Sequence, residues 1–195
     1  KGFFFMNYLV LSDIHGGAIQ AQQALSFFDK FKCDYLVLLG DLLNHGPRNG
    51  VPKDYDPMQV GEVLNQYKER IISVRGNCDS EVDSLVFSFP CNAPYGYIVQ
   101  KSEGKLKKIF LTHGHLYKLD TKEQLLKIGL TENDIVLSGH THVSGIFKKD
   151  SGIVNINPGS TTFPKGGTKA GFALIKDTAI ELYDLDGNLV NSHTW

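Results

Sequence analysis

Short apolar runs that each end at a polar residue constrain this chain more than any other feature. In the first half these runs cover residues 8–12, 35–39 and 71–74, and helical stretches near 18–32 and 58–68 separate them. Ala21, Leu25 and Phe28 recur in the first stretch at the spacing of a helix face. Strands that alternate with helices predict a mainly parallel sheet with helices on its outside.

The second half is richer in strands. Segments 97–100 and 108–111 flank a turn region at 101–107 and predict a hairpin, followed by a helix near 121–128 and a strand at 135–137. Closely spaced strands then predict an antiparallel tail, with turns at 150–152 and 186–188. These strands cover residues 145–149, 153–156, 171–176, 179–185 and 189–193. No linker or repeat divides the chain, so we predict one domain over residues 1–195. Residues 1–5, before Met6, are interpreted as an expression remnant.

Composition excludes several classes of protein. With 42% hydrophobic and 21% charged residues, the 195-residue chain is expected to fold rather than to be disordered. A net charge of -1 and the lack of a basic stretch interleaved with aromatics argue against extended nucleic-acid binding. No apolar run reaches the roughly 20 residues of a membrane span. Three widely spaced cysteines without a CxxC pair predict a reducing compartment, hence a cytoplasmic protein.

Metal-competent side chains follow five of the predicted strands. The segments are DIH at 13–15, GD at 40–41, GNCD at 76–79, THGH at 112–115 and GHTH at 139–142. Ligands collect at the carboxyl ends of strands in an open α/β sheet, so these segments are expected to meet in one cleft. Carboxylate, imidazole and amide groups suit Mn²⁺, Fe²⁺ or Zn²⁺. The candidate metal ligands are Asp13, His15, Asp41, Asn77, His113, His140 and His142.

Seven ligands are too many for one ion and suit two. Asp41 follows the buried second strand and is the natural bridge, because a carboxylate can give one oxygen to each ion. In an extended chain, the members of an i, i+2 pair such as His140 and His142 point to the same side. Each segment alone fits an ordinary turn or a core histidine, but the ordered set of five indicates a dinuclear metal site.

These motifs resemble the calcineurin-like metallophosphoesterases. The longer stretches GDLLNHGPRN, VRGNCDSEVD and NPGS are similar to the small bacterial phosphodiesterases of that family. The resemblance implies an α/β fold, a four-layer α/β/β/α sandwich of two mixed sheets. It also implies two divalent metal ions, Mn²⁺ first, with Zn²⁺, Fe²⁺ or Ni²⁺ as alternatives. It assigns Asp13, His15, Asp41 and His142 to the first metal, and Asp41, Asn77, His113 and His140 to the second.

The predicted function is a metal-dependent phosphodiesterase, in which an activated water attacks a small phosphodiester in line. The wider family has a histidine where this chain has Cys78, and that histidine is thought to help protonate the leaving group. A neutral thiol is a poor acid for that task, so Cys78 favours diesters, whose leaving groups are better on average. We interpret Cys78 itself as a small residue that shapes the pocket.

Further candidates lie beside the ligands. Arg48 is predicted to grip a phosphate oxygen and His45 to supply the proton, although both could be exposed tips of a proline-rich loop. His115 is predicted to touch substrate or tune its neighbour. Asp79 either orients a metal ligand or caps the next helical turn, and residues 157–160 form a turn that shapes the rim through its backbone. The predicted catalytic residues are Asp41, Asn77, His45, Arg48 and His115.

Two other functions compete with this one. A catalytically weak scaffold on the same fold, like the retromer subunit of eukaryotes, would tolerate loss of ligands, whereas the full set is present here. A nuclease acting on nucleic-acid ends is disfavoured by the charge, and a short nucleotide diester stays open. Exposed strand edges in the tail offer one route to a homo-oligomer.

Overall fold

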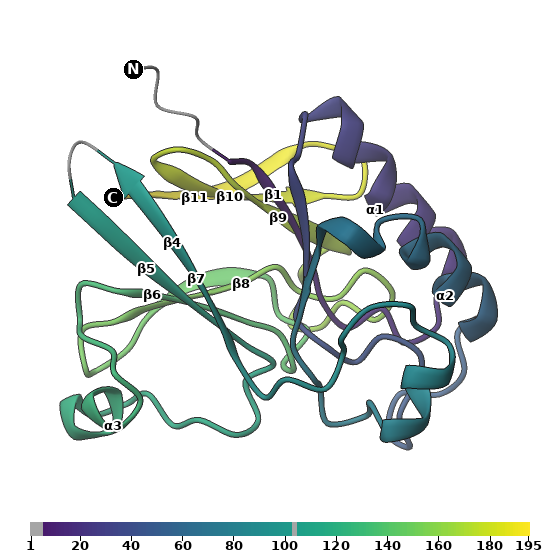
Figure 1. Ribbon diagram of the computed structural model, residues 1–195, viewed down its shortest axis with the longest axis horizontal. Helices are drawn as coiled ribbons and strands as arrows, with labels where there is room; N and C mark the ends of the chain where they lie inside the picture. Colours follow the sequence, from purple (N-terminus) through teal and green to yellow (C-terminus); the bar gives the residue numbers. More distant parts are fainter. Residues whose placement is uncertain (1–5, 103–104) are drawn as a thin grey trace.

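Two β-sheets face each other in the computed structural model, which describes residues 6–102 and 105–195 (Figure 1). The six-stranded sheet has, in order, β11 (Leu189–Thr194), β10 (Ala179–Asp184), β9 (Gly171–Ile175), β1 (Tyr8–Leu11), β2 (Tyr35–Leu38) and β3 (Ile71–Ser73). The five-stranded sheet has β4 (Gly96–Ser102), β5 (Lys105–Thr112), β6 (Ile135–Ser138), β8 (Val154–Asn157) and β7 (Gly145–Lys148). As predicted, β1, β2 and β3 pair in parallel.

Alternating side chains divide the core into layers, because successive residues of a strand point to opposite faces. Leu9 and Leu11 of β1 belong to a buried cluster with Phe28 of helix α1 (Ala18–Lys30). Val10 faces the other way and shares a second cluster with residues of β5 and β6, between the sheets. Helix α2 (Pro57–Asn65) adds to the first cluster.

A third cluster lies on the far side of the five-stranded sheet, where Phe110 of β5 packs with Leu125 of helix α3 (Lys122–Lys127). The predicted four-layer α/β/β/α sandwich of two mixed sheets is therefore confirmed. Its fourth layer is thin, because α3 has only six residues. Short 3-10 helices at Lys68–Arg70 and Glu81–Leu85 complete the elements of the described chain.

Helix ends follow local chemistry. The Asp56 side chain accepts the N–H of Gln59 at 2.9 Å, and Pro57 occupies the first turn, where its missing N–H costs nothing. The predicted helix 58–68 therefore begins one residue early, and it gives way after Asn65 to the 3-10 turn at Lys68–Arg70. Among the described residues, no helix combines the length and apolar character that crossing a membrane requires.

The prediction of an antiparallel tail is wrong in part. β7 and β8 are antiparallel, but β8 runs parallel to β6, and β9, β10 and β11 return to the other sheet. Residues 158–170 make the crossing, and Ser160 Oγ donates to the carbonyl of Asp13 at 2.6 Å on the way. The tail leaves β11 and β7 at sheet edges, as pairing between copies would require, and that pairing stays a prediction.

The hairpin is confirmed, with longer strands than predicted. β4 continues to Ser102 and β5 begins at Lys105. The connecting residues 103 and 104 lie outside the described residues, as do residues 1–5, for which an expression remnant was predicted.

Candidate metal centre

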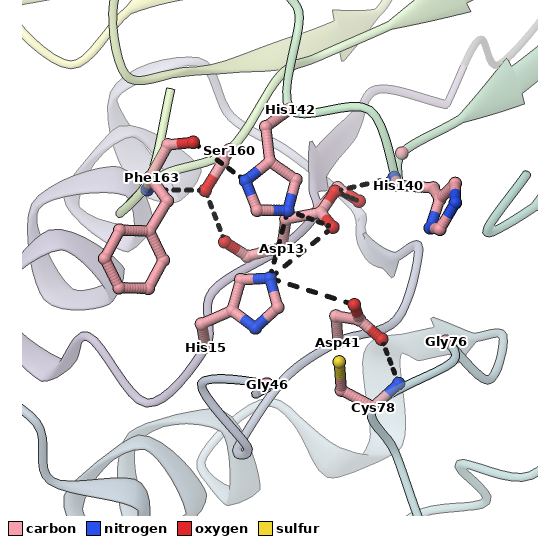
Figure 2. A network of polar contacts seen from close by, with 12 residues as sticks. Asp13, His15, Asp41, Gly46, Gly76, Cys78, His140, His142, Ser160 and Phe163 are labelled. Atoms are coloured by element: carbon pink, nitrogen blue, oxygen red, sulfur yellow. Dashed lines mark hydrogen bonds and ion pairs between the residues drawn. The ribbon is translucent and has the colours of Figure 1, made fainter. Parts of the chain in front are cut away.

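Strand ends from both sheets bring the predicted ligands to one place. Figure 2 shows five of them: Asp13, His15, Asp41, His140 and His142. Asp13 and His15 follow β1, and Asp41 follows β2, in the six-stranded sheet. His113 follows β5 and His142 follows β6, in the five-stranded sheet. The side chains of Asp13, His15 and His113 have no solvent exposure at all (0%). Burying this many ionisable groups together is unfavourable unless they are paired or bind a metal.

The backbone at the ligands is strained. Asp13, His15, Asp41, His140 and His142 all have φ between 50° and 68°, in the left-handed region that L-residues rarely adopt. Such a conformation costs roughly 1–3 kcal/mol at each residue and persists only where the surroundings enforce it. Two of the enforcing bonds are Asp13 N–H to Gly40 O at 3.0 Å and His15 N–H to Asp41 O at 2.9 Å.

The expectation that i, i+2 pairs point to the same side is wrong for His140 and His142, because these residues are not extended. Asp13 and His15 do converge, with Asp13 Oδ1 lying 3.7 Å from His15 Nε2. The ring of His142 lies 4.9 Å from that of His15, whereas the ring of His140 lies 5.1 Å from that of His113. One motif therefore supplies one imidazole to each of two groups of side chains.

Three histidines share a second feature, a fixed orientation. The Nδ1 atom of each is within hydrogen-bond distance of a backbone carbonyl: His15 of Asn44 at 2.7 Å, His113 of Leu39 at 2.8 Å, and His142 of Phe163 at 2.8 Å. A carbonyl only accepts, so Nδ1 carries the proton in all three rings. The Nε2 atoms are thereby left free to bind a metal, and metal-binding histidines in proteins commonly have their other ring nitrogen fixed by such a hydrogen bond.

The first group of ligand atoms fits a divalent cation. His15 Nε2 and His142 Nε2 approach to 3.1 Å, a distance at which two lone pairs would repel. Asp13 Oδ1 lies 3.7 Å and 3.2 Å from these two atoms and, though buried, has no hydrogen-bond partner in the described chain. A cation between them would satisfy all three atoms, and two imidazoles with a carboxylate are ligands that Zn²⁺, Mn²⁺ and Fe²⁺ accept.

The second group lies around His113. Its Nε2 atom is 3.3 Å from Asp41 Oδ2 and 3.0 Å from Asn77 Oδ1. Burial would raise the pKa of Asp41, but the hydrogen bond and charge of His113 and the N–H of Cys78 hold it at about 2. Burial would likewise lower the pKa of His113, which the carboxylates of Asp41 and Asp13 instead raise to about 9. The site is therefore built to hold a positive charge beside an ionised Asp41.

Asp79 positions Asp41, so the first of its two predicted roles is the observed one. Its carboxylate accepts the N–H groups of Asp41, Leu42 and Gly76 at 2.8, 2.8 and 2.7 Å. Burial raises the pKa of Asp79 to about 6, against the effect of these donors. The next helical turn is capped by Ser80 instead.

Residues 157–160 act through side chains, contrary to the prediction that their backbone shapes the rim. Asn157 Nδ2 donates to the carbonyl of Gly139 at 2.8 Å and to Thr141 Oγ1 at 3.0 Å, which holds the loop between the two histidines of the GHTH motif. Ser160 is the residue that binds the Asp13 carbonyl. The NPGS motif was the only sequence signal for these contacts.

A cavity of about 360 Å³ opens beside the ligands and is lined by Asp41, Asn77, His140 and His142. Arg48 and Cys78 line it as well. Burial, followed by the charge of Asp41, raises the pKa of the Cys78 thiol to about 12, so the thiol is neutral and a very weak acid. The Cys78 sulfur lies close to Gly46, where a Cβ would come within 2.9 Å of it. The small side chain of Cys78 leaves room for the 44–50 loop at this wall of the cavity.

The remaining candidates lie at the edges of this arrangement. His45 is not among the residues that line the cavity; its Nδ1 lies 2.9 Å from the carbonyl of Gly46 and its ring is edge-on to Tyr55 at 5.3 Å. His115 is exposed, with its ring 5.3 Å from that of His113 and 6.0 Å from that of His140. Burial and the neighbouring imidazoles lower the pKa of His115, which favours a neutral ring.

Residues 6–179 match the model of the calcineurin-like phosphoesterase superfamily domain. The chain belongs to this superfamily. Among calcineurin-like phosphoesterases, phosphodiesterase YfcE of Escherichia coli K12 is 37% identical over 181 residues, which are 93% of each chain. The solved structure of E. coli YfcE, a phosphoesterase, superposes with a TM-score of 0.86 over 97% of this chain and 99% of that one.

Vps29 of Entamoeba histolytica, solved with Zn²⁺, shares the fold at a TM-score of 0.51 and 22% identity, over 97% of this chain and 99% of its own. The predicted family and fold are confirmed, and so is the predicted class of enzyme, a phosphoric ester hydrolase with a site suited to divalent metal ions.

Proposed function

We propose that this calcineurin-like phosphoesterase hydrolyses small phosphodiesters with two divalent metal ions, Mn²⁺ in first place and Zn²⁺, Fe²⁺ or Ni²⁺ as alternatives. The position of Asp41 carries the proposal: its Oδ2 atom lies 3.8 Å from His15 Nε2 and 3.3 Å from His113 Nε2, between the two groups of ligands. The first ion would be held by Asp13, His15, Asp41 and His142, and the second by Asp41, Asn77, His113 and His140.

When bound, such a pair of ions supplies an activated water and neutralises charge on the phosphoryl group. The chain holds the ligands in place for this chemistry. Asp13 Oδ2 accepts from Ser12 Oγ at 2.6 Å and from the His140 N–H at 3.0 Å, which leaves Oδ1 for the centre. Arg48 lines the cavity and would bind a phosphoryl oxygen of the substrate. His115, whose ring lies 5.3 Å from that of His113, would touch the substrate or tune that neighbour.

The supply of a proton favours diesters over monoesters. With a pKa of about 12, Cys78 cannot protonate a leaving group near neutral pH. His45 is our candidate donor. Its Nδ1 atom carries the proton that faces the Gly46 carbonyl, so the ring would act in its imidazolium form and give up the proton on Nε2, which has no hydrogen bond within the described chain. A diester, with its better leaving group, depends less on such a donor, and the relative YfcE carries the name phosphodiesterase.

We also propose that the enzyme acts in the cytoplasm on a small substrate. Cys33, Cys78 and Cys91 are free, which fits the reducing cytoplasm. A near-neutral chain with a cavity of this size is suited to a small phosphodiester and not to extended nucleic acid.

The experiment compares bis(p-nitrophenyl) phosphate with p-nitrophenyl phosphate, using metal-stripped protein without metal and with Mn²⁺, Zn²⁺, Fe²⁺ or Ni²⁺ added in turn. We expect Mn²⁺-dependent cleavage of the diester, weak cleavage of the monoester, and loss of turnover in Asp41→Ala, which still folds by circular dichroism. Turnover in Asp41→Ala with unchanged metal stoichiometry would contradict the bridging role. No turnover with any of the four metals would favour the scaffold function instead.

A further inference from the structure

The cavity is also lined by two cationic side chains that have no part in holding the metal ions. Lys165 lines it from the segment that follows β8, and Arg48 lines it from the loop that follows β2. The ion pairs among the described residues include neither of these two side chains. The acidic residue that lines the cavity is Asp41, which the metal centre engages. Two cations thus face the cavity without a carboxylate of the protein to neutralise them.

The backbone of Lys165 is fixed relative to the metal centre. Its N–H donates to the carbonyl of His142 at 2.9 Å, and its own carbonyl accepts from the Thr168 N–H at 3.1 Å and from Thr168 Oγ1 at 2.8 Å. Its side chain contacts a second residue of the cavity lining, because Nζ donates to Asn49 Oδ1 at 3.1 Å. One of the three ammonium donors is used by Asn49, which leaves two for a ligand.

The amount of positive charge exceeds what a simple diester needs. A phosphodiester carries one negative charge, which would be neutralised at the metal centre with Arg48 beside it. A second anionic group on the substrate would give the Lys165 ammonium a partner, and hydrogen bonds to charged groups are stronger than those to neutral ones. Asn49 is the positioning residue for this contact, because its amide oxygen holds the ammonium at the cavity wall.

We propose that Lys165 binds a second anionic group, a phosphate or a carboxylate, on the arm of the phosphodiester that is not the leaving group. This inference rests on the proposed function and names its substrate class: diesters with an additional anionic terminus. Such substrates arise where a phosphorylated or carboxylated alcohol has been joined to a second alcohol through phosphate. Lys165 therefore determines specificity and takes no part in the displacement itself.

The test uses p-nitrophenyl diesters that share the leaving group and differ only in the other arm: alkyl, ω-phosphoalkyl or ω-carboxyalkyl, each with chains of two and four carbons. With Mn²⁺, we expect the anionic arms to raise kcat/KM roughly three- to tenfold over the alkyl arm, less at high salt. Lys165→Gln should remove this preference and leave the alkyl diester within about twofold. The phosphate and carboxylate arms show which anion is preferred.

Lys148→Gln is the matched control, since Lys148 is an exposed lysine on β7 outside the cavity lining and its loss changes the net charge equally. Equal kcat/KM for all arms in the unchanged protein, or a preference that survives Lys165→Gln, would overturn the inference and leave the proposed function standing.

If none of the diesters is hydrolysed, the proposed function fails, and the Lys165 contact is tested by calorimetric binding of propane-1,3-bisphosphonate. Affinity reduced about three- to tenfold in Lys165→Gln, but not in Lys148→Gln, would support the second anion site. Equal affinities in the three proteins would refute it.

Discussion

Replacing Asp79 by asparagine changes one atom at a point where three backbone N–H groups meet. Oδ2 accepts from Asp41 and Gly76, and Oδ1 accepts from Leu42. In the variant, the amide oxygen can keep the two donors that share Oδ2, and the amide nitrogen then faces the N–H of Leu42. One buried donor therefore loses its acceptor, and the other two lose a charged one.

The expected loss follows from these three bonds. An unsatisfied buried donor costs about 1–3 kcal/mol, and the change from a charged to a neutral acceptor costs up to about 1 kcal/mol per bond. Removing a buried carboxylate, whose pKa burial has raised to about 6, returns part of this. We expect Asp79→Asn to reduce the free energy of unfolding by about 2–3 kcal/mol. Because Asp41 loses its support, diester turnover should fall more than about tenfold.

The assay combines urea unfolding with Mn²⁺-dependent hydrolysis of bis(p-nitrophenyl) phosphate. Asp83→Asn is the matched control, because Asp83 is a similarly buried carboxylate (9% exposed against 7% for Asp79) that accepts the Ser80 N–H and lies outside the metal centre. The control should lose stability but keep its turnover once folded. Asp79→Asn with turnover within twofold of the unchanged protein would refute the view that Asp79 positions Asp41.

Four further predictions rest on other contacts in the structure. Gly76→Ala should abolish turnover although it replaces no candidate ligand, because its Cβ would lie 2.1 Å from Asp41 Oδ1 and displace that carboxylate. Gly96→Ala, with neighbours at 3.8 Å or more, should leave turnover unchanged in the same assay. Mn²⁺ at 100 times its Kd should stabilise the metal-stripped protein by about 2.7 kcal/mol, and a melting temperature that does not rise with Mn²⁺ would argue against a site in the folded state. Burial would raise the pKa of Asp184, but hydrogen bonds from Lys169 and Asn188 hold this pKa at about 2. The stability that Asp184 contributes is therefore present above about pH 4 and is lost as the pH falls towards 2. Thermal unfolding of Asp184→Asn should lack this acid-dependent decrease in stability. His45→Ala should slow diesters with poor leaving groups more than those with good ones, and equal losses would exclude His45 as the proton donor.

Much of the fold could be predicted because the apolar pattern and the turns agree with it. Strands such as β1 and β2 are buried on both faces, so their sequences are continuously apolar and easy to detect. The partition of the tail between the sheets could not be predicted in the same way. β8 alternates apolar and polar residues and β9 is continuously apolar, but neither pattern identifies the sheet that the strand joins. The contact made between the two strands, Ser160 with the Asp13 carbonyl, joins residues 147 positions apart.

The candidate metal ligands could be predicted because each follows an apolar strand, and this position in the sequence does not depend on the backbone conformation of the residue itself. Their backbone geometry was not detectable, since nothing in the letters of DIH or GHTH signals a left-handed residue, and glycine would be the usual choice there. Lys165 carried no signal either, because its place at the cavity depends on the hydrogen bond from its N–H to the carbonyl of His142. That bond joins two separate loops and is not encoded in the local sequence of either.

The division of the ligands between the two sheets has a consequence for folding kinetics. The first group joins His15, after β1, with His142, after β6, so the complete set exists only once the sheets have docked. A transition state for folding in which docking is incomplete cannot bind the ions as the native state does. Metal ions should then slow unfolding in proportion to their affinity and leave the folding rate nearly unchanged. Bound metal would then stabilise the docked sheets against separation, and the lifetime of the native state would depend on the supply of metal.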